Sequence, residues 1–290
     1  YHYLARVTGI VRTKVTLVNH HLAHAASAFY CSPWSQAVII TADGKGDGLC
    51  GGVYLGDELG LHCLDQVPNR YSVGQMYQAV TKFLGYRPNR HEGKITGLAA
   101  YGDSAKTLDE LRAVLGVDGA DEFYNRFYED ELLERDPSRY YSRRVVDKSY
   151  MSSRQVRLLG RRQRPYGVVH QLYQNYLAEH VGDSSPQDLA AGIQYLTEEL
   201  ITGYAVRQLK GRLPCKVCLA GGVFANVKVN QRIREIEGVE GLYVQPAMDD
   251  AGCALGAALQ VVAEHGHLKR SELEVYQGPE YSQRQLEERI

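Results

Sequence analysis

The chain has 290 residues, of which 33 are Lys or Arg and 34 are Asp or Glu, so its formal net charge is -1. This balance gives no reason to expect a nucleic-acid partner, because binding to a phosphate backbone needs clustered positive charge. Hydrophobic residues make up 44% of the chain and charged residues 23%, which is typical of a globular protein. No stretch approaches the roughly 18 apolar residues of a membrane helix, and we expect no membrane partner. Six cysteines are too few for a disulfide scaffold at this length and favour a cytoplasmic location.

The first half of the chain alternates predicted strands and helices. A β-branched segment at residues 14–19 predicts a short strand, and an alanine-rich segment at 20–30 predicts a helix that ends before Pro33. Residues 36–42 form a continuous apolar run, which is typical of a strand buried on both faces. The elements expected next are a glycine-rich turn at 43–48, strands at 51–55 and 61–67, and helices at 73–84 and 93–101.

The second half of the chain is more regular. Residues 104–165 are charged and irregular, and they predict an insertion. The elements expected after it are helices at 168–181 and 187–209, a strand at 217–220, a helix at 224–236, a strand at 241–244 and a helix at 251–265. This order of strands and helices predicts an α/β fold with a mostly parallel, helix-covered sheet.

A histidine cluster stands at the start of the first predicted helix. His20 and His24 are four residues apart and would share one helical face, whereas His21 would point roughly 100° away. Two imidazoles on one face can bind a divalent metal side by side, and carboxylates from elsewhere would have to complete the ligand shell. The alternative interpretation is a polar helix start with ordinary titrating histidines.

A glycine-rich segment follows the apolar strand and contains Asp43, Gly44, Gly46 and Asp47. Glycines let backbone amides approach an anion closely, and a carboxylate at the end of a strand is well placed to hold a metal. The pattern therefore indicates a phosphate-binding hairpin that also carries a metal ligand. A tight hairpin turn would explain the glycines equally well, but it would not explain Asp43 at the end of an apolar strand.

Two further segments combine small residues with polar ones after predicted strands. Gly221 and Gly222 precede a predicted helix and could let a nucleotide lie against the backbone, while Asn226 could hydrogen-bond its ribose or base. Asp250 could supply the remaining carboxylate of the metal site. The alternatives are a compact strand-to-helix turn for the glycine pair and a helix N-cap for Asp250.

Five motifs together resemble one known family. HHLAHAASAFYCSPW, TADGKGDG, PNRHEGKITGLAAYG, LAGGVFANVKVNQ and MDDAGCALGAA occur in the order found in O-carbamoyltransferases, both nodulation-type and antibiotic-tailoring. From about residue 18 to about residue 280 the chain is also similar to the catalytic domain related to the tRNA threonylcarbamoyl-transfer protein. The resemblance implies an actin-like, ribonuclease-H-like ATPase fold, with two lobes around a nucleotide cleft.

The resemblance also assigns roles to the candidate residues. It implies that His20, His24, Asp43 and Asp250 bind iron or another divalent metal. It implies that the hairpin at 43–48 holds phosphate, and that the adenosine part of ATP or carbamoyl-adenylate meets Gly221, Gly222 and Asn226. In the segment HEGKITG, the residues expected to line the cleft with less defined roles are Glu92, Lys94 and Gly97. For Glu92 and Lys94 the alternative is a helix start whose charges face solvent.

The activity implied by the resemblance is carbamoyl transfer. Family members make carbamoyl-adenylate from ATP and carbamoyl phosphate and pass the carbamoyl group to a hydroxyl, here of a small-molecule acceptor. Two alternatives stay open, namely a tRNA threonylcarbamoyl-transfer-like enzyme and a nucleotide-binding module without turnover. The near-neutral charge gives no basic face of the size that tRNA would need.

The resemblance further divides the chain into regions. We expect residues 1–103 to form part of a first lobe, 104–165 the insertion, 166–275 the second lobe and 276–290 a linker towards an adenylate-forming domain. Nothing before His20 resembles the strand hairpin with which such proteins begin. We therefore expect a piece of a longer protein that lacks both ends of the fold and does not make the adenylate alone.

Overall fold

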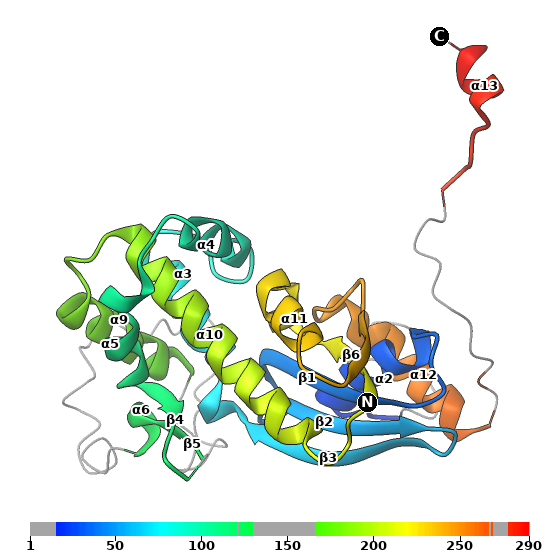
Figure 1. The fold of residues 1–290 in the computed structure, drawn as a ribbon, viewed down its shortest axis with the longest axis horizontal. Helices are drawn as coiled ribbons and strands as arrows, with labels where there is room; N and C mark the ends of the chain where they lie inside the picture. The colour runs from blue at the N-terminus through cyan, green and yellow to red at the C-terminus, as the bar shows by residue number, and fades with distance from the viewer. Residues whose placement is uncertain (1–15, 121, 130–165, 267, 269–277, 290) are drawn as a thin grey trace, which may run out of the picture.

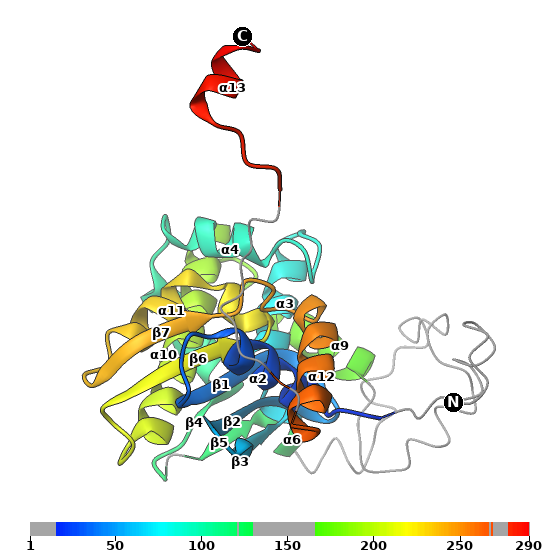
Figure 2. The ribbon, with the colours of Figure 1, turned by 90° about the vertical axis from the view of Figure 1, so that its right-hand side faces the viewer.

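A computed structural model describes residues 16–120, 122–129, 166–266, 268 and 278–289 as a mixed α/β fold (Figure 1). Its centre is a five-stranded sheet with the strand order β3-β2-β1-β6-β7. The strands are β1 (Ala37–Gly46), β2 (Leu49–Asp57), β3 (Gly60–Pro68), β6 (Cys215–Ala220) and β7 (Val239–Val244). β1, β6 and β7 run parallel, as the sequence predicts, while β2 and β3 form an antiparallel meander beside β1 (Figure 2).

Helices cover both faces of the sheet. They are α2 (His20–Cys31), α10 (Pro186–Leu209), α11 (Val227–Arg234) and α12 (Ala251–Glu264). Alternate residues of β1 pack on opposite faces of the sheet. Val38 and Ile40 pack towards α10 and α11, and Ile39 packs against α2. Because both faces are buried, the central strand needs a continuous apolar sequence rather than an alternating one.

A helical region lies beside the sheet (Figure 1). It contains α3 (Val73–Phe83), α4 (Glu92–Ala99), α5 (Leu108–Arg112), α6 (Arg126–Glu129), α9 (Tyr166–His180) and a hairpin of β4 (Leu115–Val117) and β5 (Phe123–Asn125). The first part of α10 buries Ile193 and Leu196 in this region, and its last turns bury Tyr204 and Leu209 against the sheet. α10 therefore belongs to both regions and joins them.

Short 3₁₀ turns complete the described part of the chain, together with a last helix. The turns are η1 (Asn69–Tyr71), η2 (Ser104–Lys106) and η5 (Gly222–Ala225). The helix is α13 (Gln283–Glu287), and it is exposed. Within the described residues, no helix combines the length and the hydropathy needed to cross a membrane.

Four predicted elements need correction. Residues 16–19 are not a strand, and the rest of the strand predicted at 14–19 lies outside the described residues. The turn predicted at 43–48 shrinks to two residues, because β1 continues through a register irregularity to Gly46. The helix predicted at 224–236 is divided into η5 and α11 because Asn226 caps a new helix. In the predicted insertion, residues 104–120 and 122–129 carry regular short elements, whereas 121 and 130–165 lie outside the described residues.

The predicted lobes, residues 1–103 and 166–275, both contribute strands to the one sheet. The same two segments both supply helices to the helical region. The lobe boundaries and the actin-like classification stay predictions.

Candidate functional site

The candidate residues gather at one edge of the sheet, where the parallel strands β1 and β6 end. Asp43 lies in the last part of β1, and Gly221 and Gly222 follow β6 directly. α2 begins at the same edge with His20, and Asp250 is the residue before α12. Open α/β sheets place their ligands at the carboxyl ends of parallel strands, since loops from several strands meet there.

The histidine pair has the predicted arrangement. The Nε2 atoms of His20 and His24 are 3.1 Å apart, and the His24 side chain is completely buried. His21 turns away from this pair, and its Nδ1 lies 3.0 Å from Oγ1 of Thr41 on β1. The start of α2 is stabilised by Asn19, whose side chain accepts hydrogen bonds from the first backbone N–H groups of the helix.

Two carboxylates reach the same pair of imidazoles. Oδ2 of Asp43 lies 3.3 Å from Nε2 of His20, and Oδ1 of Asp250 lies 3.6 Å from Nε2 of both His20 and His24. The structure therefore brings together all four predicted metal ligands, although they come from three separate segments of the sequence.

The charges of these groups depend on one another. The contact with Asp43 is the largest influence on His20 and raises the pKa of its imidazole to about 10. Burial alone would raise the pKa of Asp43, but the hydrogen bond to His20 brings it below its ordinary value. Burial lowers the pKa of the neighbouring His21 to about 4, so this imidazole is neutral at pH 7.

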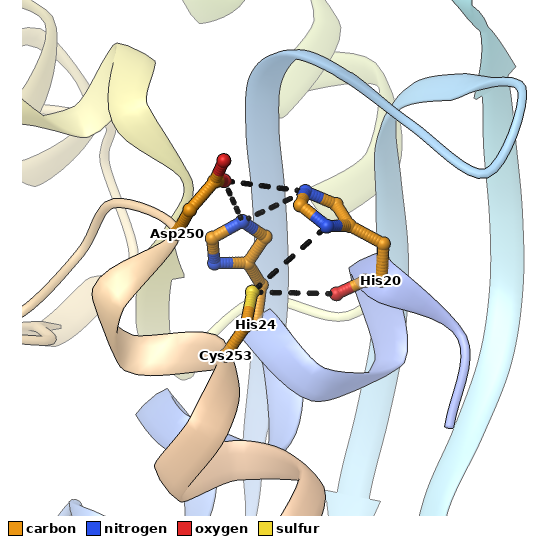
Figure 3. A group of neighbouring side chains, drawn as sticks. All are labelled: His20, His24, Asp250 and Cys253. Carbon is orange, nitrogen blue, oxygen red and sulfur yellow. Dashed lines mark hydrogen bonds and ion pairs between the residues drawn. The ribbon is translucent and has the colours of Figure 1, made fainter. Parts of the chain in front are cut away.

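Cys253 is a member of the cluster that the sequence analysis missed. His20, His24, Asp250 and Cys253 each offer a ligand atom, and these four atoms lie within 4.8 Å of one another (Figure 3). The thiol sulfur lies 4.0 Å from Nδ1 of His20. Burial acts to raise the pKa of this thiol, but the contacts with His20 and His24 outweigh it and lower the pKa. The spacing Asp250-x-x-Cys253 at a helix start was the available signal, because residues three apart share a helical face.

The donor set fits a divalent metal of the first transition row. Two imidazole nitrogens 3.1 Å apart can share only one proton between them, whereas one cation can accept a lone pair from each. The nearby carboxylates supply negative charge, and Oδ1 of Asp250 lies equally far from both imidazoles. Imidazole and carboxylate ligands together suit Fe²⁺, Zn²⁺, Co²⁺ or Mn²⁺.

The glycine-rich end of β1 supports the histidines. A Cβ atom on Gly46 would lie 2.0 Å from the His20 ring, so this position needs a glycine for His20 to sit where it does. Oδ2 of Asp47, which the resemblance places on phosphate, accepts a hydrogen bond of 2.8 Å from the backbone N–H of His20. The carbonyl of Gly44 accepts hydrogen bonds from Ser72 and Gln75, which tie the hairpin to α3.

The glycine pair after β6 lies against β1. Gly221 has φ +105°, and a Cβ there would lie 2.1 Å from the carbonyl oxygen of Ala42. The backbone N–H of Gly222 lies 3.3 Å from Oδ1 of Asp43 and donates to it. Asn226 caps α11 and exchanges two side-chain hydrogen bonds with Gln194 of α10, at 2.8 and 3.1 Å.

Glu92, Lys94 and Gly97 lie on α4 in the helical region. Oε1 of Glu92 accepts a hydrogen bond from the backbone N–H of Asn89, and Nζ of Lys94 lies 5.5 Å from the centre of the Tyr86 ring. A Cβ on Gly97 would meet no atom within 4 Å among the described residues. These contacts are local to α4 and its preceding loop, and they do not bring the three residues to the histidine cluster.

Curated relatives cover nearly the whole chain. A nodulation protein NolNO from Sinorhizobium fredii is 32% identical over 98% of this chain and 37% of its own length. A nodulation protein NolO from Bradyrhizobium diazoefficiens is 32% identical over 93% of this chain and 43% of its own length. A tRNA N6-adenosine threonylcarbamoyltransferase from Thermomicrobium roseum is 35% identical, but over only 37% of this chain and 30% of its own length. The chain thus spans about two fifths of the length of the nodulation proteins.

A solved structure, the crystal structure of T. kodakarensis HypF, aligns with 94% of this chain and 40% of its own. Its TM-score is 0.44 and its sequence identity 17%, and we base no argument on this likeness. The family profile described as "Carbamoyltransferase N-terminus" matches residues 1–259. Because this match covers most of the chain, the protein belongs to the carbamoyltransferase family.

Proposed function

We propose that the chain is the metal-binding transfer part of an O-carbamoyltransferase with an actin-like fold. The observation that carries the proposal is the convergence of His20, His24, Asp43 and Asp250 at the carboxyl ends of β1 and β6. Family membership supplies the group that is transferred. The acceptor that we propose is the hydroxylated small molecule that the resemblance to O-carbamoyltransferases implies.

The proposed reaction uses carbamoyl-adenylate as the donor. The acceptor hydroxyl oxygen forms a bond to the carbamoyl carbon, and the bond from that carbon to the phosphate oxygen of the adenylate breaks. AMP leaves with the electron pair of the broken bond, and the hydroxyl proton passes to solvent. A divalent metal, with iron as the first candidate, would supply positive charge near the phosphate and carbamoyl oxygens.

The chain's own residues would hold and orient these groups. His20 and His24 come from a helix whose start is fixed by Asn19 and Asp47, so their imidazoles need little reorganisation to bind an ion. We keep Gly221 and Gly222 as candidate contacts to the adenylate, although their Cβ positions face Ala42 and Asp43 and their backbone N–H groups donate to Met248 and Asp43. We keep Asn226 as a candidate contact to the adenosine, although its amide already bonds to Gln194.

The donor itself would come from ATP and carbamoyl phosphate. This step needs an adenylate-forming domain, which we propose to lie in the remaining length that the curated relatives have. A test of the present chain therefore has to supply carbamoyl-adenylate directly.

The test compares metal-loaded variants in single-turnover transfer. The chain is loaded with Fe²⁺ under anaerobic conditions and mixed with synthetic carbamoyl-adenylate and a panel of sugars and hydroxylated aromatic compounds. AMP release and the mass of the carbamoylated acceptor are followed together. We expect His24→Ala to lower the bound iron by at least about tenfold and to abolish transfer, because a ligand is lost from the site.

The control is His62→Ala. His62 is exposed on β3 and pairs with Asp57, away from the cluster, so iron content and transfer should stay at the level of the unaltered chain. Full iron occupancy and full transfer in His24→Ala would refute the proposal. Tight binding of the adenylate with no transfer to any acceptor would instead support a nucleotide-binding module, and transfer to tRNA alone would support the threonylcarbamoyl alternative.

A further inference from the structure

The first turn of α12 presents two metal-binding side chains rather than one. Asp250 is the residue before the helix, and Cys253 is the third residue inside it. The backbone N–H of Cys253 donates to the carbonyl of Asp250 at 3.1 Å, so the turn is closed and both residues belong to it. Residues three apart lie on the same helical face, and here that face is turned towards α2.

Close packing of α12 on α2 sets the distance from the thiol to the imidazoles. A Cβ on Gly256 would lie 1.8 Å from the carbonyl oxygen of Ala23, so only glycine allows the two helices to approach this closely. Ala23 lies between His20 and His24 along α2. The helix contact thus brings the Cys253 sulfur to 4.0 Å from both Nδ1 and the carbonyl oxygen of His20.

Among the described residues, this sulfur forms one cluster of possible metal ligands with the imidazoles of His20 and His24 and the carboxylate of Asp250 (Figure 3). With metal–nitrogen bonds near 2.0 Å and metal–sulfur bonds near 2.3 Å, neighbouring ligand atoms of one metal lie about 3–3.5 Å apart. The distances of 3.1 and 3.6 Å among the nitrogen and oxygen ligands are close to this range. The ligand atoms of the whole set lie within 4.8 Å of one another, and the thiol, which faces Nδ1 of His20, has to turn towards Nε2 to join them.

We propose that Cys253 is a fifth, thiolate ligand of the metal held by His20, His24, Asp43 and Asp250. This inference rests on the metal site of the proposed function and goes beyond the ligands that the sequence predicts. A thiolate makes the site selective for a borderline-soft ion such as Fe²⁺, Co²⁺ or Zn²⁺ over Mg²⁺. It also makes the site sensitive to oxidants, since a metal-free thiolate is oxidised to a sulfenic acid.

The test is a Co²⁺ titration of the metal-free chain, followed by absorption spectroscopy. Thiolate ligation produces a sulfur-to-cobalt charge-transfer band in the near ultraviolet, separate from the visible bands that report cobalt in any such site. We expect the charge-transfer band in the unaltered chain and in Cys63→Ser, which changes an exposed cysteine of β3. We expect Cys253→Ser to lose this band, to keep the visible bands and to bind Co²⁺ about ten- to a hundredfold more weakly.

A second measurement needs no substitution. Co²⁺ should slow the alkylation of Cys253 by iodoacetamide, mapped by peptide mass, while exposed Cys63 reacts at the same rate with and without metal. A charge-transfer band that survives in Cys253→Ser, or equal alkylation of Cys253 with and without Co²⁺, would overturn the thiolate assignment. Failure of the unaltered chain to bind Co²⁺ would overturn both the assignment and the proposed function. A thiolate band in a chain that transfers no carbamoyl group would uphold the ligand and refute only the transferase.

Discussion

The sheet region and the helical region differ in where they bury histidines. In the helical region the core is built from apolar side chains such as Ile95, Leu111 and Leu196, which are almost fully buried. In the sheet region the layer between β1 and α2 also buries His21 and His24 completely. Buried polar groups lower stability unless they are paired, and Nε2 of His21 and Nδ1 of His24 have no hydrogen-bond partner among the described residues. The comparison shows that both regions bury polar side chains, Thr81 and Gln194 in the helical region among them, whereas among the described residues the completely buried imidazoles lie beside the candidate site.

A chain of polar contacts connects the two regions. The hydroxyl of Tyr77 on α3 lies 2.9 Å from Oγ1 of Thr96 on α4 and donates to Oε1 of Gln194 on α10 at 3.0 Å. Gln194 in turn bonds to Asn226, the residue that caps α11 beside the sheet. These contacts link the regions together with α10 and with the hydrogen bonds of Ser72 and Gln75 to Gly44.

The largest loss of stability should come from Gly221→Ala in the sheet region. The added Cβ would lie 2.1 Å from the carbonyl oxygen of Ala42, and alanine is strained at φ +105°. We expect the free energy of unfolding to fall by at least about 3 kcal/mol, because neither backbone can move without disturbing the pairing of β1 and β6. Urea denaturation followed by circular dichroism measures this loss, and metal content should fall with it.

Gly97→Ala in the helical region is the matched control. A Cβ there would meet no described atom within 4 Å, and alanine favours a helix by about 1 kcal/mol over glycine. Stability should stay the same or rise. If transfer nevertheless disappears in a stable Gly97→Ala chain, the predicted position of Gly97 in the cleft is supported and the two regions are not separate in function.

The connection between the regions can be tested with Tyr77→Phe. The substitution removes the hydroxyl that Thr96 and Gln194 share, and burial of this site prevents water from replacing it easily. We expect a loss of about 1–2 kcal/mol in the free energy of unfolding, with unchanged metal content. Tyr195→Phe on the exposed side of α10 should change neither quantity. A loss of metal in Tyr77→Phe would show that the helical region controls the site.

The smallest expected effect is on the pH dependence of stability, through a histidine of the helical region. Burial, together with the charge of Lys82, lowers the pKa of His170 on α9 to about 4, whereas an unfolded histidine titrates near 6.5. Between these values the unfolded chain binds more protons, so the contribution of His170 is complete above pH 6.5 and is lost as the pH falls towards 4. After discounting for partial exposure, His170→Gln should reduce the loss of stability between pH 7 and pH 5 by about 1 kcal/mol.

Urea denaturation at the two pH values measures this difference. His265→Gln, at the exposed end of α12, controls for the removal of a histidine as such. An identical pH dependence in His170→Gln and the unaltered chain would contradict the expectation.

Local patterns in the sequence were enough to predict much of the site. The spacing of His20 and His24 predicts a shared helical face because an α-helix has 3.6 residues per turn, and the structure confirms that face. The apolar run before Asp43 predicts a buried strand that ends in a carboxylate. Asp47 shows what such reasoning leaves out: its position in a glycine-rich segment indicated a phosphate contact, which stays a prediction, and the structure adds a hydrogen bond from the backbone N–H of His20 to its carboxylate.

The amino-acid order by itself determined which residues lie on each helical face, where the buried strands run and, through five motifs, the family. These properties are local, because they depend on the backbone repeat and on short-range hydrophobic patterns. Only the tertiary structure decided that Cys253 joins the histidines and that Glu92 and Lys94 contact Asn89 and Tyr86. Both outcomes depend on which helices pack together, and the contact of Gly256 with Ala23 joins positions more than two hundred residues apart.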